Sequence, residues 1–170
     1  MKDNLVHAVA HMLKSEGGFA NHPLDPGGMT NLGVTQRVWE EWVGHPVTEK
    51  DMRALTPTIV APMYKKKYWD TVAGDSLPSG VDLAVFDFAV NSGPGRAAKM
   101  LQRVLGVAED GAIGPVTLAK ATSVDSSKLV ADYNIVRLAF LKALPTWGTF
   151  GRGWSDRVAS VTAEAITMTA

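Results

Sequence analysis

The sequence contains no cysteine, which excludes disulfide bonds and any chemistry that depends on a thiolate. It carries no excess of charge either, because 17 Lys and Arg residues balance 17 Asp and Glu residues. Bulk charge therefore gives no reason to expect a nucleic acid or an anionic membrane as a partner. No stretch reaches the roughly 18 apolar residues that a membrane span needs. The amphipathic N-terminus lacks the apolar core of a secretory signal, so we expect synthesis in the bacterial or host cytoplasm and export by another route, such as a holin.

Metal-binding patterns are equally sparse. Among the four histidines, His7 and His11 stand at helical i, i+4 spacing, which two metal ligands could share. No glutamate adjoins His7 to complete a zinc-protease motif. Both histidines fall on the helix flank away from Leu5 and Val9, where we expect surface residues. The sequence predicts no metal site and no cofactor.

What the sequence does contain is an unusual carboxylate. Residues 3–16 have the apolar spacing of a helix, through Leu5, Val9, Met12 and Leu13, and Glu16 falls on the same stripe. Gly17 and Gly18 follow as an expected left-handed C-cap. An apolar setting and the negative end of a helix both favour a neutral carboxyl group, as a general acid requires. The alternative is a glutamate that reaches solvent or pairs with a Lys or Arg.

A second carboxylate supports the functional interpretation. Asp25 lies nine residues after Glu16, beyond a turn, and a glycine-rich ribbon up to Gly33 follows it. A helix-end glutamate that faces a loop aspartate is the paired-carboxylate arrangement of glycoside hydrolysis. The aspartate's place across a ribbon predicts room for a water molecule between the two groups, and hence an inverting reaction.

The remaining chain predicts an all-α single domain of about eight helices, with a small irregular or β-hairpin lobe at 19–35. Residues 81–90 are apolar on almost every side and should form a buried central helix, ended by Asn91-Ser92-Gly93-Pro94. Asn91 is then either a C-cap or a polar group at the floor of a cleft. The other expected helices are 36–43, 48–55 with a capping box, 58–69, 95–105, 115–122, 126–144 as the longest, and 154–168 after a glycine-rich connection at 147–153.

Several motifs together resemble one known family. They are Glu16-Gly17-Gly18-Phe19, Asp25-Pro26-Gly27-Gly28, Thr30, Gly33-Val34-Thr35, Tyr64, Tyr68-Trp69, Phe86 to Gly93, Leu101-Gln102, Leu105-Gly106 and Asp110 to Leu118. In these residues the sequence resembles glycoside hydrolase family 108, lysozyme-like enzymes of bacteria and phages that degrade peptidoglycan. The resemblance extends over roughly residues 5–158. Its C-terminal part is similar to the family's predicted peptidoglycan-binding region.

The resemblance implies an N-acetylmuramidase that cleaves the β-1,4 bond between N-acetylmuramic acid and N-acetylglucosamine, with Glu16 as the catalytic acid. A looser similarity to phage lysozymes implies that Asp25 activates water and that Thr30 holds it, although Thr30 has a different offset from the aspartate. Tyr68, Trp69 and Asn91 match positions expected to line the sugar groove; core packing and helix capping are the alternatives.

The resemblance further implies a bacteriolytic enzyme, a phage endolysin or a bacterial wall remodeller, with peptidoglycan as its partner. We expect it to be a monomer. Residues 1–93 would be the catalytic part. Residues 94–170 would be either a wall-binding module or, as we expect without a linker, part of the same core. A non-catalytic wall-binding or secretion-associated protein and a lytic transglycosylase are the competing functions.

Overall fold

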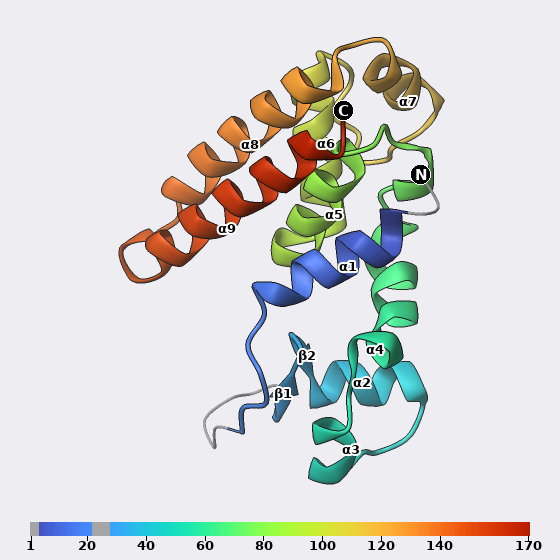
Figure 1. Cartoon of the computed structure of the whole chain (residues 1–170), viewed down its shortest axis with the longest axis vertical. Helices are drawn as coiled ribbons and strands as arrows, with labels where there is room; N and C mark the ends of the chain where they lie inside the picture. The colour runs from blue at the N-terminus through green and yellow to red at the C-terminus, as the bar shows by residue number, and fades with distance from the viewer. Residues whose placement is uncertain (1–3, 22–27) are drawn as a thin grey trace. The chain divides into compact units, whose positions relative to one another are not determined.

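The structure is a computed structural model that describes residues 4–21 and 28–170. Over these residues it contains nine α-helices and one small antiparallel sheet, which confirms the predicted all-α class (Figure 1). The elements are α1 (Asn4–Lys14), β1 (Thr30–Asn31), β2 (Val34–Thr35), α2 (Gln36–Val43), α3 (Glu49–Arg53), α4 (Pro57–Tyr64), α5 (Val81–Ser92), α6 (Pro94–Leu105), α7 (Pro115–Thr122), α8 (Ser126–Lys142) and α9 (Trp147–Thr167). No helix in the described part of the chain is long and apolar enough to cross a membrane.

The chain divides into two compact units. The first, here called the hairpin unit, comprises residues 9–64. The second, the helical unit, comprises residues 65–170 and the N-terminal residues up to Ala8. The expected division of function at residue 93 stays a prediction.

In the hairpin unit, the short helices α2 and α3 begin where side-chain caps are available. The Thr35 hydroxyl accepts a hydrogen bond from the Val38 N–H and starts α2, and Gly44 ends it with φ 81°. The predicted capping box before α3 is confirmed, because Thr48 and Asp51 exchange side-chain and backbone hydrogen bonds. These caps leave the hairpin of β1 and β2 directly joined to α2.

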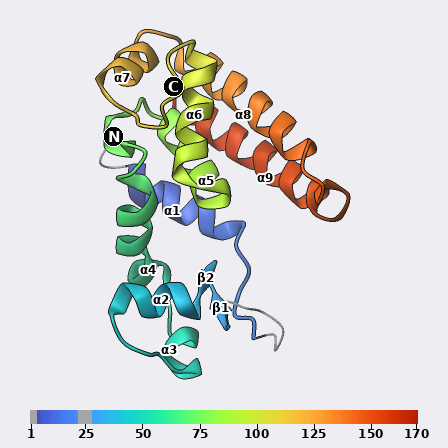
Figure 2. The same ribbon diagram turned by 180° about the vertical axis from the view of Figure 1, so that it is seen from behind.

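The helical unit is built around α5, as predicted. Residues Val81 to Ala89 are buried on every side of this helix, which packs against α6, α8 and α9. The α8 and α9 helices follow each other in the chain and lie side by side in both views (Figures 1 and 2). Their contact is the most extensive between any two elements of the described chain.

An ion-pair cluster joins three of these helices. Asp87 on α5 accepts hydrogen bonds from Arg137 Nη2 on α8 at 2.6 Å and from Arg157 Nη2 on α9 at 2.9 Å. Burial alone would raise the pKa of Asp87, but the two arginine charges outweigh it and hold that pKa below its ordinary value. Asp87, Arg137 and Arg157 are called the buried triad below.

Most predicted helices differ from the observed ones by one or two residues at their ends, and two of them differ more. The expected helix 58–69 is α4 followed by a π-helical turn at Lys65–Trp69. Pro62 inside α4 has no N–H to donate to the preceding turn, so the regular hydrogen-bond ladder is already broken there. The expected connection at 147–153 is wrong, because these residues form the start of α9. With 21 residues α9 is longer than α8, which has 17.

Aromatic side chains pack along α9, and one of its glycines lies against them. The Trp154 ring centroid lies 6.2 Å from that of Trp147 and 5.6 Å from that of Phe150. A Cβ atom on Gly151 would come within 2.6 Å of the Trp147 ring. Gly151 is therefore present to make room for the indole rather than to break the helix.

The two histidines of α1 have different environments. His7 is exposed, and its Nε2 lies 2.6 Å from the Glu164 carboxylate on α9. His11 is buried, with 5% of its surface exposed, so the expectation of a surface position was wrong for this residue. Residues at i and i+4 lie next to each other on one face of a helix, but only His11 of this pair is buried.

Candidate active site

A tight turn connects the two strands of the hairpin. Thr30 pairs with Thr35 and Asn31 with Val34, so Leu32 and Gly33 alone form the loop. Both have positive φ values, 50° for Leu32 and 73° for Gly33, which is the pattern of a type I′ turn. Leucine in this conformation costs about 1 kcal/mol, because its Cβ crowds the following carbonyl oxygen. The turn is therefore locally strained.

Glu16 and Tyr64 converge on this turn. A Cβ atom on Gly33 would lie 2.8 Å from Glu16 Oε2 and 2.9 Å from Tyr64 Oη. The Tyr64 hydroxyl donates a hydrogen bond of 2.9 Å to the Leu32 carbonyl oxygen, and the tyrosine itself is 2% exposed. The missing side chain of Gly33 thus leaves the space that the Glu16 carboxylate and the tyrosine hydroxyl occupy.

Glu16 reaches this position from beyond the end of α1. The helix ends at Lys14, two residues earlier than predicted, although the Glu16 N–H still donates to the Leu13 carbonyl oxygen at 3.2 Å. Neither Gly17 nor Gly18 has a positive φ, so the expected left-handed C-cap was wrong. A half-buried carboxylate on such an extension, at an exposed turn, can deliver a proton to a bound substrate.

The segment after Glu16 is tied to the same hairpin. Ala20 and Thr30 exchange two backbone hydrogen bonds of 2.8 Å, so residue 20 extends the hairpin as an isolated third strand position. The Phe19 ring, one residue earlier, lies 3.7 Å from the Arg53 guanidinium carbon on α3. Glu16 is consequently held between the end of α1 and a paired segment.

Thr30 lies on the hairpin face opposite the core. Its neighbour Asn31 is buried and donates its side-chain N–H to the Met52 carbonyl oxygen at 2.9 Å. Successive side chains of a strand point to opposite faces, so Thr30, which is half-buried, points away from Met52. Thr30 is thus part of the hairpin whose turn the Glu16 carboxylate adjoins, and the roles expected for the two residues stay predictions.

Asp25 lies outside the described residues. The residues that flank its segment are placed at the hairpin: Asn21 follows the Ala20–Thr30 pair, and Gly28 precedes it on the other side. Gly28 has φ 72°, and a Cβ atom there would come within 2.9 Å of Gln36 Oε1 at the start of α2.

The three expected sugar-binding residues belong to the helical unit. Tyr68 is half-buried in the π-helical turn. Trp69 is fully buried, with its ring 5.5 Å from that of Phe86 and its Nε1 donating to Asp75 at 3.0 Å. Asn91 is half-buried in the last turn of α5 rather than beyond it, and its Oδ1 accepts a hydrogen bond from Ser92. Of the two interpretations of Trp69, its burial corresponds to core packing.

Three residues of the site were given no place in it by the sequence interpretation, although Gly33 and Tyr64 belong to the motifs of the resemblance: Leu32, Gly33 and Tyr64. A two-residue loop that ends in glycine between paired threonines was the available signal for the turn. No local signal could indicate that Tyr64, 48 positions after Glu16, reaches the same turn. Within residues 4–21 and 28–170, no three His, Asp or Glu side chains are grouped as a metal site would require.

Two protein families match the chain. Residues 9–93, which contain the hairpin and Glu16, match the family Glycosyl hydrolase 108. The chain belongs to this family. Residues 96–159 match a second family, described as a predicted peptidoglycan domain.

Among solved structures, SagA of Brucella abortus is similar, with 44% sequence identity and a TM-score of 0.86. The similarity covers 99% of this chain and 97% of the SagA chain. None of the curated proteins compared with the chain matches it. Membership of family 108 together with the second match makes the protein a peptidoglycan-related glycoside hydrolase.

Proposed function

We propose that this glycoside hydrolase is an N-acetylmuramidase, which cleaves the β-1,4 bond between N-acetylmuramic acid and N-acetylglucosamine. Glu16 is the general acid that protonates the leaving oxygen. The observation that carries this proposal is the position of the Glu16 carboxylate against Gly33, at a strained turn that Tyr64 also holds. Strain of this kind is retained where a function depends on it.

Asp25 and Thr30 complete the proposed machinery. Asp25 activates the attacking water, and Thr30 positions that water on the exposed face of the hairpin. The support for this assignment is that both ends of the Asp25 segment, Asn21 and Gly28, lie beside β1. Room for a water molecule requires the two carboxyl groups to be roughly 6.5–9.5 Å apart, and the reaction then inverts the anomeric carbon.

Tyr68 and Asn91 bind sugar residues in this proposal, because both are half-buried and present polar groups. Trp69 contributes indirectly: its buried ring fixes the turn that carries Tyr68. The enzyme acts as a monomer on the wall, as a phage endolysin or a bacterial wall remodeller. Residues 94–170 belong to the same domain as the catalytic part.

Mass spectrometry of muropeptides tests the bond that is cleaved. Purified peptidoglycan is digested with the native enzyme and reduced, and we expect N-acetylmuramic acid at the reduced ends. Reduced N-acetylglucosamine would indicate a glucosaminidase, and 1,6-anhydro ends a lytic transglycosylase. If the digestion produces no new glycan ends, the protein binds the wall without cleaving it.

Glu16→Gln separates catalysis from structure in the same assay. Glutamine has the shape of the protonated acid but cannot transfer its proton, so turnover should fall by about 10²–10⁴-fold. The melting temperature should remain within a degree or two of the native value. A marked drop in melting temperature with substantial residual activity would instead identify Glu16 as a structural ion-pair partner.

Asp25→Asn tests the water-activating role. A general base acts only after the sugar has bound, so we expect a large loss of turnover with nearly native binding to the wall. An NMR time course of the native enzyme should show the α-anomer as the first product. If the β-anomer forms first, the reaction is retaining and Asp25 does not activate the attacking water.

A further inference from the structure

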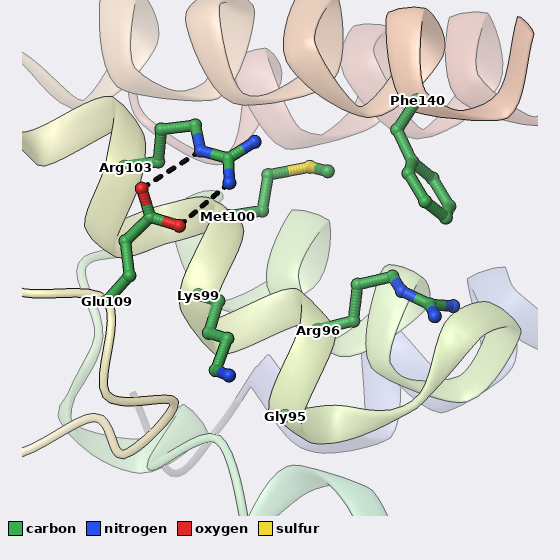
Figure 3. Close-up of a pocket in the computed structure, with 7 residues that line it drawn as sticks. All are labelled: Gly95, Arg96, Lys99, Met100, Arg103, Glu109 and Phe140. Carbon is green, nitrogen blue, oxygen red and sulfur yellow. Dashed lines mark hydrogen bonds and ion pairs between the residues drawn. The ribbon is translucent and has the colours of Figure 1, made fainter. Parts of the chain in front are cut away.

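A hollow of about 410 Å³ lies in the helical unit, between α6, α8 and the loop that follows α6. It is called the cationic pocket here, and its lining is drawn in Figure 3: Gly95, Arg96, Lys99, Met100, Arg103, Glu109 and Phe140. Three cations come from α6 at positions i, i+3 and i+7, which share one face of a helix. The volume is within the usual range of small-ligand sites, about 300–1,000 Å³.

Core residues hold the wall of this pocket in place. Gln102, which is buried, donates to Asp110 at 2.6 Å and to the Ala112 carbonyl oxygen at 3.0 Å, and it accepts from the Gly111 N–H at 2.9 Å. These bonds fix the loop against α6. The Lys99 side chain runs along Gly111, where an added Cβ atom would be 3.2 Å from Lys99 Cε.

The aromatic side of the pocket is equally ordered. Phe140 packs edge-to-face on the buried Phe88, with centroids 5.9 Å apart. The Arg96 guanidinium carbon lies 4.8 Å from the Phe140 centroid, and its Nη1 donates to the Ser92 carbonyl oxygen at 3.3 Å. Arg96 is therefore oriented before any ligand binds, which lowers the entropy that binding costs.

The charge of the pocket is unbalanced. Arg103 forms a two-pronged ion pair with Glu109, at 2.8 and 3.0 Å (Figure 3). In the described part of the chain, no ion pair joins Arg96 or Lys99 to a carboxylate. The four charged residues of the lining sum to +2. Lys99 also interacts electrostatically with Asp110 beside the pocket, and counting this carboxylate leaves a local charge of +1, in a protein whose formal net charge is zero.

Two cations beside the apolar surfaces of Met100 and Phe140 select an anion attached to an aliphatic group. Arginine recognises carboxylates in particular, through parallel N–H donors. In peptidoglycan the glycan strand offers no such group, since the lactyl carboxyl of muramic acid is amide-bonded to the peptide. The peptide stem has several free carboxylates beside methyl and methylene groups.

We infer that the cationic pocket binds a carboxylate of the peptidoglycan peptide stem, with Arg96 and Lys99 as the ligating cations. This inference rests on the proposed function in so far as peptidoglycan is the substrate. The second family match, at residues 96–159, contains all of the lining except Gly95. Binding at this pocket would keep the enzyme on strands that still carry peptides.

The test is calorimetric titration of the full chain with a synthetic stem tripeptide, L-alanyl-γ-D-glutamyl-meso-diaminopimelate. We expect measurable binding that weakens with added salt, and a loss of at least tenfold in affinity for Lys99→Glu. Lys120→Glu is the matched control, because Lys120 lines a separate hollow of about 200 Å³ and its reversal should leave affinity unchanged. Lys99→Gln, which only neutralises the charge, should give a smaller loss and provides a second variant if Lys99→Glu folds poorly.

The same peptide with its carboxylates amidated should bind at least tenfold more weakly to the native protein. Absence of binding by the native chain, unchanged affinity in both Lys99 variants, or competition by inorganic phosphate as strong as that by the peptide would overturn the inference. The tripeptide contains no glycosidic bond, so its binding does not depend on whether Glu16 cleaves. A failure here with muramidase products in the digestion assay would reject the pocket alone, and the converse result would reject the proposed reaction alone.

Discussion

The turn at Leu32 and Gly33 shows how one missing side chain can organise a site. The glycine satisfies two separate requirements: a positive φ, and open space for the Glu16 carboxylate and the Tyr64 hydroxyl. Either requirement alone would favour glycine, but only the open space bears on catalysis. A glycine elsewhere in the hairpin unit that needs the positive φ but not the space allows the two effects to be measured separately.

Gly33→Ala is expected to reduce both stability and activity. The positive φ costs about 1 kcal/mol for an L side chain. The new Cβ atom must also displace Glu16 Oε2, from which it would be 2.8 Å away, and a shift of about 1 Å at a catalytic group can cost 10²-fold in rate. Urea unfolding and a wall-turbidity assay measure the two effects.

Gly44→Ala is the control for the loss of stability that a positive φ causes in any residue with a side chain. Gly44 caps α2 with φ 81° and has nothing within 4 Å of an added Cβ atom. We expect a similar loss of stability with native activity. Equal activity in both alanine variants would show that the space at Gly33 has no catalytic importance.

At the scale of elements, the sequence predicted those helices correctly whose capping residues or apolar pattern lie within the helix itself or next to it. Thr48 with Asp51, and the all-round apolar run of α5, specify their helices from neighbouring residues alone. Glu16 and Gly151 are different. The Glu16 carboxylate lies against a turn 16 residues later, and the glycine at 151 leaves room for the Trp147 ring, so neither residue can be interpreted from backbone propensity alone.

Gly151→Ala should therefore destabilise the protein, although alanine is the better helix former. The added Cβ atom would be 2.6 Å from the Trp147 ring, and overpacking of this kind costs about 1–3 kcal/mol. Gly153→Ala, two residues later, meets nothing within 4 Å and should stabilise α9 by about 0.5–1 kcal/mol. Opposite shifts in the urea midpoint would agree with this account, whereas two stabilising substitutions would show that the indole moves away freely.

At the scale of the molecule, a net charge of zero conceals an uneven distribution of charge. The buried triad has two arginines for one aspartate, and the cationic pocket has three cations for one glutamate. Composition alone could exclude bulk attraction to polyanions, but it could not reveal such local imbalance. The triad joins residues that are far apart in the sequence, such as Asp87 and Arg157, whereas the charged residues of the pocket all lie within residues 96–109.

The buried triad predicts how stability depends on pH. The pKa of Asp87 in the folded protein is lowered, because Arg137 and Arg157 outweigh the opposing effect of burial. The stabilisation is thus complete above the unfolded value of about 3.9 and is lost as pH falls through the lower, folded pKa. Asp87→Asn leaves two arginines without their carboxylate and should cost about 3–5 kcal/mol at pH 7.

Urea unfolding of native protein and Asp87→Asn between pH 7 and pH 2 tests this dependence. The difference in unfolding free energy should be constant down to about pH 4 and should then shrink, because the native protein alone loses the charge of Asp87. Asp132→Asn is the control: its ion pair with Lys128 is solvent-exposed, so its loss should cost less than about 1 kcal/mol at any pH. If instead the unfolding free energies of the native protein and Asp87→Asn differ by the same amount down to pH 2, protonation of Asp87 has no effect on stability. The charge of Asp87 would then not hold α5, α8 and α9 together.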